Sequence, residues 1–342
     1  MGTSRIIARA TQLVPIYNYG ARLLISCQFA TSPHHHVMTS MSYSLPKVCM
    51  MMAMAISCMM MMSQAASSTA AMAPRDGEGG GRRHHFVLVH GLCHGAWCWY
   101  RVATALRRAG HRVTALDMAA AGASPARVDE VRTFEDYSRP LLAALAALLP
   151  SGDGERVVLV GHSHGGFSVA LAAERFPERL AAVVFLTASM PPVGRAMANT
   201  TDEYVSFVGA DFFLDSRVLE QTNPDIPGNP EIFGPNFMAQ KLYQLSPPED
   251  LTLALSLIRP ANRFTGDALM RDAGLLTKER YGSTRRVFVV VEDDHAIPVE
   301  FQRRMVAENP GVEVVDIAGA DHMAMISKPA KLADLLVRIA AN

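Results

Sequence analysis

The sequence predicts an α/β protein with a doubly wound, mostly parallel sheet that carries an inserted helical cap. Short Val- and Leu-rich runs recur from residue 84 onward, and helical patterns lie between them. Near-continuous apolar runs are typical of strands that are buried on both faces of a parallel sheet. The regular alternation of strand and helix therefore favours a doubly wound arrangement.

Six runs supply the expected strands, at residues 85–90, 112–117, 156–160, 182–186, 287–291 and 312–317. Helical periodicity places the main helices at about 96–109, 134–149, 164–175 and 299–307. A last helix is expected over residues 329–341, where Pro329 suits the first turn.

The alternation stops between about residues 191 and 281, where prolines cluster and no strong strand is evident. So long a gap favours an inserted helical subdomain over a loop. In a doubly wound fold, such a cap would lie over the carboxyl ends of the strands, where ligands bind. We therefore expect one domain over residues 84–342 with a cap at about 191–281, whose residues shape the substrate pocket.

Residues 1–83 are expected to be a disordered leader outside the core. No Asp or Glu precedes Asp76, which is typical of organellar transit segments. The Met-rich run at 48–62 resembles the apolar part of a signal peptide but is too short for a confident membrane span. Translation from Met72 is an equal alternative. We expect a cytoplasmic protein without stable membrane insertion, with plastid or secretory targeting as alternatives.

The bulk composition favours a small-molecule partner. Lys+Arg and Asp+Glu are both 32, so the formal net charge is zero and nothing indicates a nucleic-acid or polyionic partner. The five cysteines have neither disulfide-framework nor zinc-site spacing, which favours a reduced intracellular domain. No metal or organic cofactor is expected, and a homodimer is left open.

Gly161-His162-Ser163-His164-Gly165 matches the G-x-S-x-G motif between an expected strand and an expected helix. That context marks the nucleophile elbow of the α/β-hydrolase fold, in which a tight turn exposes the serine above the sheet. Ser163 is therefore the candidate nucleophile. The backbone N–H of His164, at a helix N-terminus, would stabilise the developing oxyanion.

The turn His90-Gly91-Leu92-Cys93-His94-Gly95 follows the first expected strand. This fold places its second oxyanion-hole N–H there, so the amide of Leu92 is the candidate partner of the His164 amide. His94 and Cys93 are interpreted as structural or pocket-lining.

A general base and an acid must follow the serine in chain order. His322 lies on a loop past the last expected strand, so it is the candidate base. Glu292, Asp293 and Asp294 all follow the penultimate strand, and their spacing does not choose among them.

Six further segments of the sequence belong together, at residues 85–91, 93–97, 161–163, 241–244, 248–251 and 319–323. They resemble the plant methylesterase and hydroxynitrile lyase family of α/β-hydrolases, including its methyl salicylate esterases and pathogen-induced cereal esterases. The resemblance runs from about His84 to the C-terminus and does not cover the leader.

The resemblance implies a catalytic acid two residues before Ala296-Ile297-Pro298, which is Asp294. It implies methyl esters of plant signals, such as salicylate, jasmonate or indole-acetate, as substrates of a serine carboxylesterase. The lyases carry Thr and Lys where this chain has Gly91 and Met323, which disfavours lyase chemistry. His164 is shared with the cereal esterases and replaces a common Leu of methyl salicylate esterases, which predicts an altered pocket. A hydroxynitrile lyase and a hormone receptor with a slow triad are the alternatives.

Overall fold

The computed structural model describes residues 82–148 and 156–342. The expected leader lies outside the described residues except for its last two positions. In the described segments, no helix combines the length and apolarity that crossing a membrane requires.

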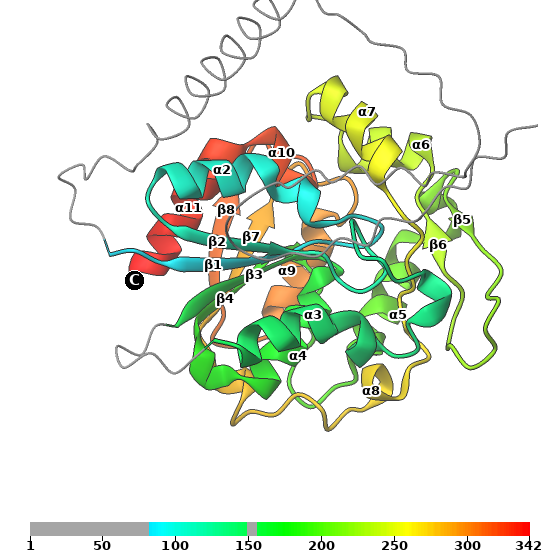
Figure 1. The fold of residues 1–342 in the computed structure, drawn as a ribbon, viewed down its shortest axis with the longest axis horizontal. Helices are drawn as coiled ribbons and strands as arrows, with labels where there is room; N and C mark the ends of the chain where they lie inside the picture. The colour runs from blue at the N-terminus through cyan, green and yellow to red at the C-terminus, as the bar shows by residue number, and fades with distance from the viewer. Residues whose placement is uncertain (1–81, 149–155) are drawn as a thin grey trace, which may run out of the picture. The chain divides into compact units, whose positions relative to one another are not determined.

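The described chain forms a six-stranded parallel sheet in the order β2-β1-β3-β4-β7-β8 (Figure 1). Its strands are β1 His85–Val89, β2 Arg112–Leu116, β3 Val157–Ser163, β4 Leu180–Ala188, β7 Arg286–Val291 and β8 Glu313–Ile317. The inner strands β1, β3, β4 and β7 are buried almost throughout, whereas the edge strands β2 and β8 are largely half-buried or exposed. This sheet confirms the predicted fold class, because each expected apolar run became one of its strands.

Helices cover both faces of the sheet. One face packs against α2 Tyr100–Arg108, α10 Ala324–Ser327 and α11 Pro329–Ala341. The other packs against α3 Phe134–Ala146, α4 Gly165–Arg175 and α9 Val299–Ala307. The expected helix at 96–109 begins instead as a 3-10 turn, Ala96–Trp99, and α3 ends three residues early.

The insertion lies between β4 and β7 and consists of short elements. They are α5 Met197–Val208, β5 Arg217–Val218, β6 Glu231–Ile232, α6 Pro235–Phe237, α7 Pro248–Leu257 and α8 Ala268–Arg271. A π-helical turn, Met238–Leu242, continues α6. The antiparallel pair of β5 and β6 was not predicted, because two-residue strands are too short to show a periodicity.

Candidate active site

Ser163 is the last residue of β3 and has a φ of +54°, the left-handed conformation that non-glycine residues rarely adopt. The turn that follows is tight enough to require its flanking glycines. A Cβ at Gly161 would lie 2.7 Å from a methyl of Val169, and one at Gly165 would lie 2.5 Å from the carbonyl oxygen of His90. The sequence therefore folds locally into a strained strand-to-helix turn with Ser163 at its apex.

His322 lies on the loop between β8 and α10 and is 3% exposed. Its Nδ1 is 2.7 Å from Oδ2 of Asp294, on the loop after β7. An ionised carboxylate only accepts hydrogen bonds, so Nδ1 carries the proton and donates it. When the imidazole of His322 is neutral, Nε2 therefore carries no proton and can accept one. The structure thus brings together His322 and Asp294, which lie on two different loops and are 28 positions apart in the sequence.

Both oxygens of Asp294 are held by hydrogen bonds. Oδ1 accepts from the amides of Ala296 (2.7 Å) and Ile297 (2.8 Å), and Oδ2 accepts from Thr187 Oγ1 (2.5 Å) as well as from His322. The side chain of Asp294 is fully buried. It therefore has a fixed orientation behind the imidazole. By contrast, the two neighbouring acids in the sequence, Glu292 and Asp293, are exposed.

Thr187 was missed by the sequence analysis. The pairing of β3 with β4 passes from His162↔Leu186 to Ser163↔Ala188, so Thr187 is an extra residue in β4. Such a bulge redirects a side chain, and here the fully buried Thr187, with φ +35°, donates to Asp294. The available signal was a hydroxyl residue directly after the apolar run of β4, at the carboxyl edge of the sheet.

The loop after β1 is fixed by two histidines. Met118 N donates to His90 Nε2, so His90 Nδ1 carries the proton that it donates to the Gly91 carbonyl at 2.7 Å. His94 Nδ1 lies 2.9 Å from the Leu92 carbonyl, and Tyr243 Oη lies 2.9 Å from His94 Nε2. These bonds hold the Leu92 peptide in place, in keeping with the structural interpretation of His94.

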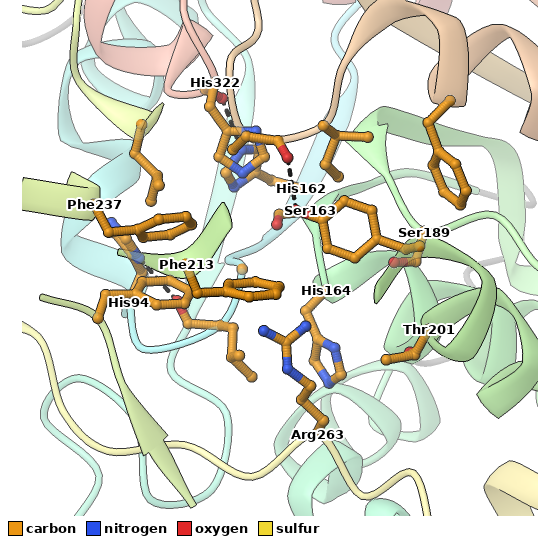
Figure 2. A pocket seen from close by; sticks show the side chains of 18 of the residues that line it. His94, His162, Ser163, His164, Ser189, Thr201, Phe213, Phe237, Arg263 and His322 are labelled. Atoms are coloured by element: carbon orange, nitrogen blue, oxygen red, sulfur yellow. Dashed lines mark hydrogen bonds between the residues drawn. The ribbon is translucent and has the colours of Figure 1, made fainter. Parts of the chain in front are cut away.

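One cavity joins the predicted site residues (Figure 2). Ser163, His322, Leu92 and His164 all line it, while Asp294 lies behind His322. The insertion supplies much of the remaining wall, in agreement with the expectation that it shapes the pocket. Those residues are Thr201, Tyr204, Phe213, Phe233, Phe237, Leu242 and Arg263.

Burial favours the neutral form of three histidines in the cavity wall and of the nearby Cys93 thiol. Desolvation lowers the pKa of His94 and of His164 to about 3, and it lowers the pKa of His162 well below its usual range. Burial also raises the pKa of the Cys93 thiol, which opposes formation of a reactive thiolate. Across residues 82–148 and 156–342, no group of three or more His, Cys, Asp or Glu side chains could hold a metal ion.

Gly91, where the lyases carry Thr, has little space for a side chain. A Cβ there would lie 2.8 Å from Ser163 Cβ and 3.2 Å from His162 Nδ1. Met323, where they carry Lys, is fully buried. The packing at both positions therefore suits the residues that this chain has.

The fold and the elbow define the class of protein, and comparison with known proteins agrees. Residues 86–335 match the Alpha/beta hydrolase family. The chain is similar to the crystal structure of polyneuridine aldehyde esterase, with 42% identity and a TM-score of 0.72 over 75% of this chain and 99% of the other. It is an α/β hydrolase.

Its sequence relatives narrow this class. The chain is 57% identical over 265 residues to the probable esterase PIR7A of Oryza sativa subsp. japonica, covering 78% of this chain and 99% of that protein. It is 46% identical over 259 residues to methyl jasmonate esterase 1 of Vitis vinifera, covering 75% and 97%. The chain belongs to the plant methylesterase family of carboxylic ester hydrolases.

Proposed function

We propose that Ser163, His322 and Asp294 act as a catalytic triad that hydrolyses small methyl esters through an acyl-enzyme. The single observation that carries this proposal is the Nδ1–Oδ2 contact of 2.7 Å between His322 and Asp294 beside the strained Ser163. This contact leaves Nε2 of His322 to act as the base that a weakly nucleophilic serine requires.

In the first half-reaction, Ser163 Oγ attacks the ester carbonyl carbon while His322 Nε2 takes the hydroxyl proton. The amides of Leu92 and His164 stabilise the oxyanion. The intermediate collapses as the C–O bond to the alcohol breaks, and His322 returns the proton to the departing oxygen, which releases methanol from a methyl ester. Water then attacks the acyl carbon while His322 takes one of its protons, and as the bond from this carbon to Ser163 Oγ breaks, His322 returns the proton to Oγ and the carboxylic acid is released.

The relatives suggest which esters to test first. One is named a methyl jasmonate esterase, and another, 46% identical, is named salicylic acid-binding protein 2. We therefore propose methyl esters of small plant signals as substrates. Methyl jasmonate, methyl salicylate and methyl indole-acetate form a suitable panel, with turnover followed by methanol release.

The test compares the wild-type protein with Ser163→Ala. We expect at least one ester to be hydrolysed and Ser163→Ala to lose about 10³-fold or more in kcat. Ser256→Ala, at an exposed serine on α7, is the matched control and should keep full activity. Full hydrolysis by Ser163→Ala would refute the triad. Tight ligand binding without turnover in the wild type would favour a receptor, and cyanide release from mandelonitrile at a rate comparable to ester hydrolysis would favour a lyase.

We also propose that residues 84–342 act as one hydrolase domain with 191–281 as its cap, in the cytoplasm. Protein that starts at Met72 should then have the same kcat/KM as the full chain. Mass spectrometry of the mature N-terminus and imaging of the full chain test the leader and the compartment.

A further inference from the structure

Arg263 is an unusual member of the cavity wall. It lies in the insertion, on the segment between α7 and α8, whereas Ser163 belongs to the sheet. Much of the wall that the insertion contributes is aromatic or aliphatic, and no Asp or Glu lines the described cavity. Figure 2 shows the Arg263 head group directed toward the cavity, below Phe213 and beside His164. A cation therefore faces an otherwise largely apolar space.

Two contacts fix the orientation of this guanidinium. Its Nε lies 2.6 Å from Oε1 of Glu231, and the two side chains are 21% and 14% exposed. Its Cζ lies 5.3 Å from the centre of the Phe213 ring, within the range of a cation–π contact. Glu231 therefore balances the charge at Nε. In the part of the chain that the structure describes, neither Nη group donates to another residue.

His164 supplies a second polar group without a partner. Its side chain is buried, and Nε2 makes no hydrogen bond to any described residue. Burial and then the charge of Arg263 lower the pKa of this imidazole to about 3, so the ring is neutral at physiological pH. A neutral imidazole has one donor and one acceptor nitrogen. It can share a polar ligand with the guanidinium without adding charge.

A buried polar atom without a partner, such as His164 Nε2, is costly unless a ligand meets it, and the partly exposed Nη groups of Arg263 beside it have free N–H donors to offer the same ligand. The fork of guanidinium N–H groups matches oxygen acceptors, and carboxylates in particular, in a bidentate geometry. A purely alkyl or aryl acyl chain would leave both Nη groups without a partner. The cavity is thus complementary to a ligand that is apolar in its middle and carries an oxygen at the end that reaches the insertion.

We propose that Arg263, assisted by His164, is a specificity subsite for an oxygen acceptor, a carboxylate or a ketone, at the far end of the acyl part of the substrate. The ester carbonyl lies at Ser163 while the distal oxygen accepts from the Nη groups. The inference rests on the proposed function, since it names the substrate class of the same site.

The experiment uses three methyl esters of matched length on the full chain. They are the monomethyl ester of adipic acid, methyl heptanoate with a ketone at its penultimate carbon, and methyl heptanoate itself. We expect the wild type to prefer the first two. In Arg263→Leu, kcat/KM for the acceptor-bearing esters relative to methyl heptanoate should fall about 10- to 100-fold, the range for a hydrogen bond to a charged group.

Removing Arg263 leaves Glu231 without its partner and can impair folding. The double variant Arg263→Leu/Glu231→Gln removes that charge and should show the same loss of preference. Arg263→Lys, which keeps the charge but not the fork, should recover part of the preference for the carboxylate and little for the ketone. If the relative kcat/KM values of the three esters are the same in the wild type and in the Arg263 variants, the subsite is overturned.

The outcomes separate this inference from the proposed function. Hydrolysis of methyl heptanoate with an unchanged ratio in both Leu variants would refute the subsite and leave the triad intact. If neither these three esters nor the plant-signal esters are hydrolysed, the triad proposal fails. The affinity of the adipate monoester, measured by calorimetry, then tests the subsite independently of turnover. Binding that weakens about 10-fold or more in Arg263→Leu supports it, and equal binding overturns it.

Discussion

The sheet and the insertion hold the two sides of the cavity by different means. The sheet side rests on long apolar strands whose residues are almost all buried, so its geometry is set by packing. The insertion side consists of short elements with exposed apolar residues, such as Leu253 and Leu255 on α7. Its position depends on a few buried or half-buried polar side chains that bind it to the body of the domain.

Three such anchors stand out. Asp250 of α7 accepts from Tyr100 Oη and Arg101 Nη2, each at 2.6 Å. Arg259 donates to three carbonyl oxygens, at distances from 2.7 to 3.1 Å, on the loop after β2. Asp321, next to the candidate base, accepts from the amide of Leu245 and the hydroxyl of Ser246.

This difference between the sheet side and the insertion side shows how one cavity can combine rigidly held reactive residues with a wall that tolerates change. Ser163, His322 and Asp294 all lie at the sheet edge, where backbone packing leaves little freedom. Most of the aromatic wall, together with Arg263, lies in the insertion. Changes in the sheet should therefore affect kcat and folding, and changes in the insertion should affect KM and substrate preference. The following variants test that division.

The largest effect is expected at Asp294. Asp294→Asn should lower kcat about 10⁴-fold with little change in KM, because the imidazole would lose the acceptor that fixes its tautomer. Steady-state kinetics on a hydrolysed methyl ester measure this. Glu292→Gln is the matched control, since that acid is exposed on the same loop and should change kcat less than about twofold. Equal effects of the two variants would contradict the assignment of the acid.

The next largest effect is expected at Gly166, where α4 lies close to the backbone of Ser189. A Cβ at Gly166 would lie 2.0 Å from the Ser189 carbonyl oxygen, so Gly166→Ala must displace α4 or the end of β4. We expect the free energy of unfolding to fall by about 3 kcal/mol, measured by urea denaturation. Gly266→Ala, in the insertion, meets only a Pro227 methylene at 3.3 Å and should cost far less. Similar losses would mean that the two regions do not differ in rigidity.

Loosening an anchor should change binding more than chemistry. Asp250→Ala removes the acceptor of Tyr100 and Arg101, and we expect about 2 kcal/mol of lost stability together with a raised KM and a nearly unchanged kcat. Limited proteolysis should show earlier cleavage within the insertion. Glu249→Ala, at the exposed neighbour, should leave all three measurements unchanged. A fall in kcat alone would contradict the proposed division.

The smallest effect concerns pH. His164 has a pKa of about 3 in the folded chain, lowered by burial and then by Arg263 and His90, against an ordinary value of 6.5. Below pH 6.5 only the unfolded chain takes up the proton, so stability falls as the pH falls from 6.5 toward 3. At pH 5.5 the contribution is roughly 1 kcal/mol. His164→Leu should reduce the loss of stability between pH 7.5 and 5.5 by that amount, and an unchanged loss would contradict a buried neutral imidazole.

The sequence predicted the sheet well because its strands are apolar runs with clear boundaries, and it predicted the elbow because Gly161 and Gly165 have a steric role that is local. The choice of Asp294 over Glu292 and Asp293 required family resemblance, since only the folded loops show which carboxylate meets His322. Thr187 and Arg263 were missed for a related reason. A bulge depends on pairing between strands, and the direction of an arginine depends on distant partners such as Glu231.

The bonds around Asp294 bear on repeated turnover. Its bonds to Thr187, Ala296 and Ile297 do not involve the histidine, so three of the four hydrogen bonds to the carboxylate are independent of the imidazole ring. The acceptor for His322 Nδ1 is therefore positioned by the protein itself and does not have to be rebuilt in each turnover.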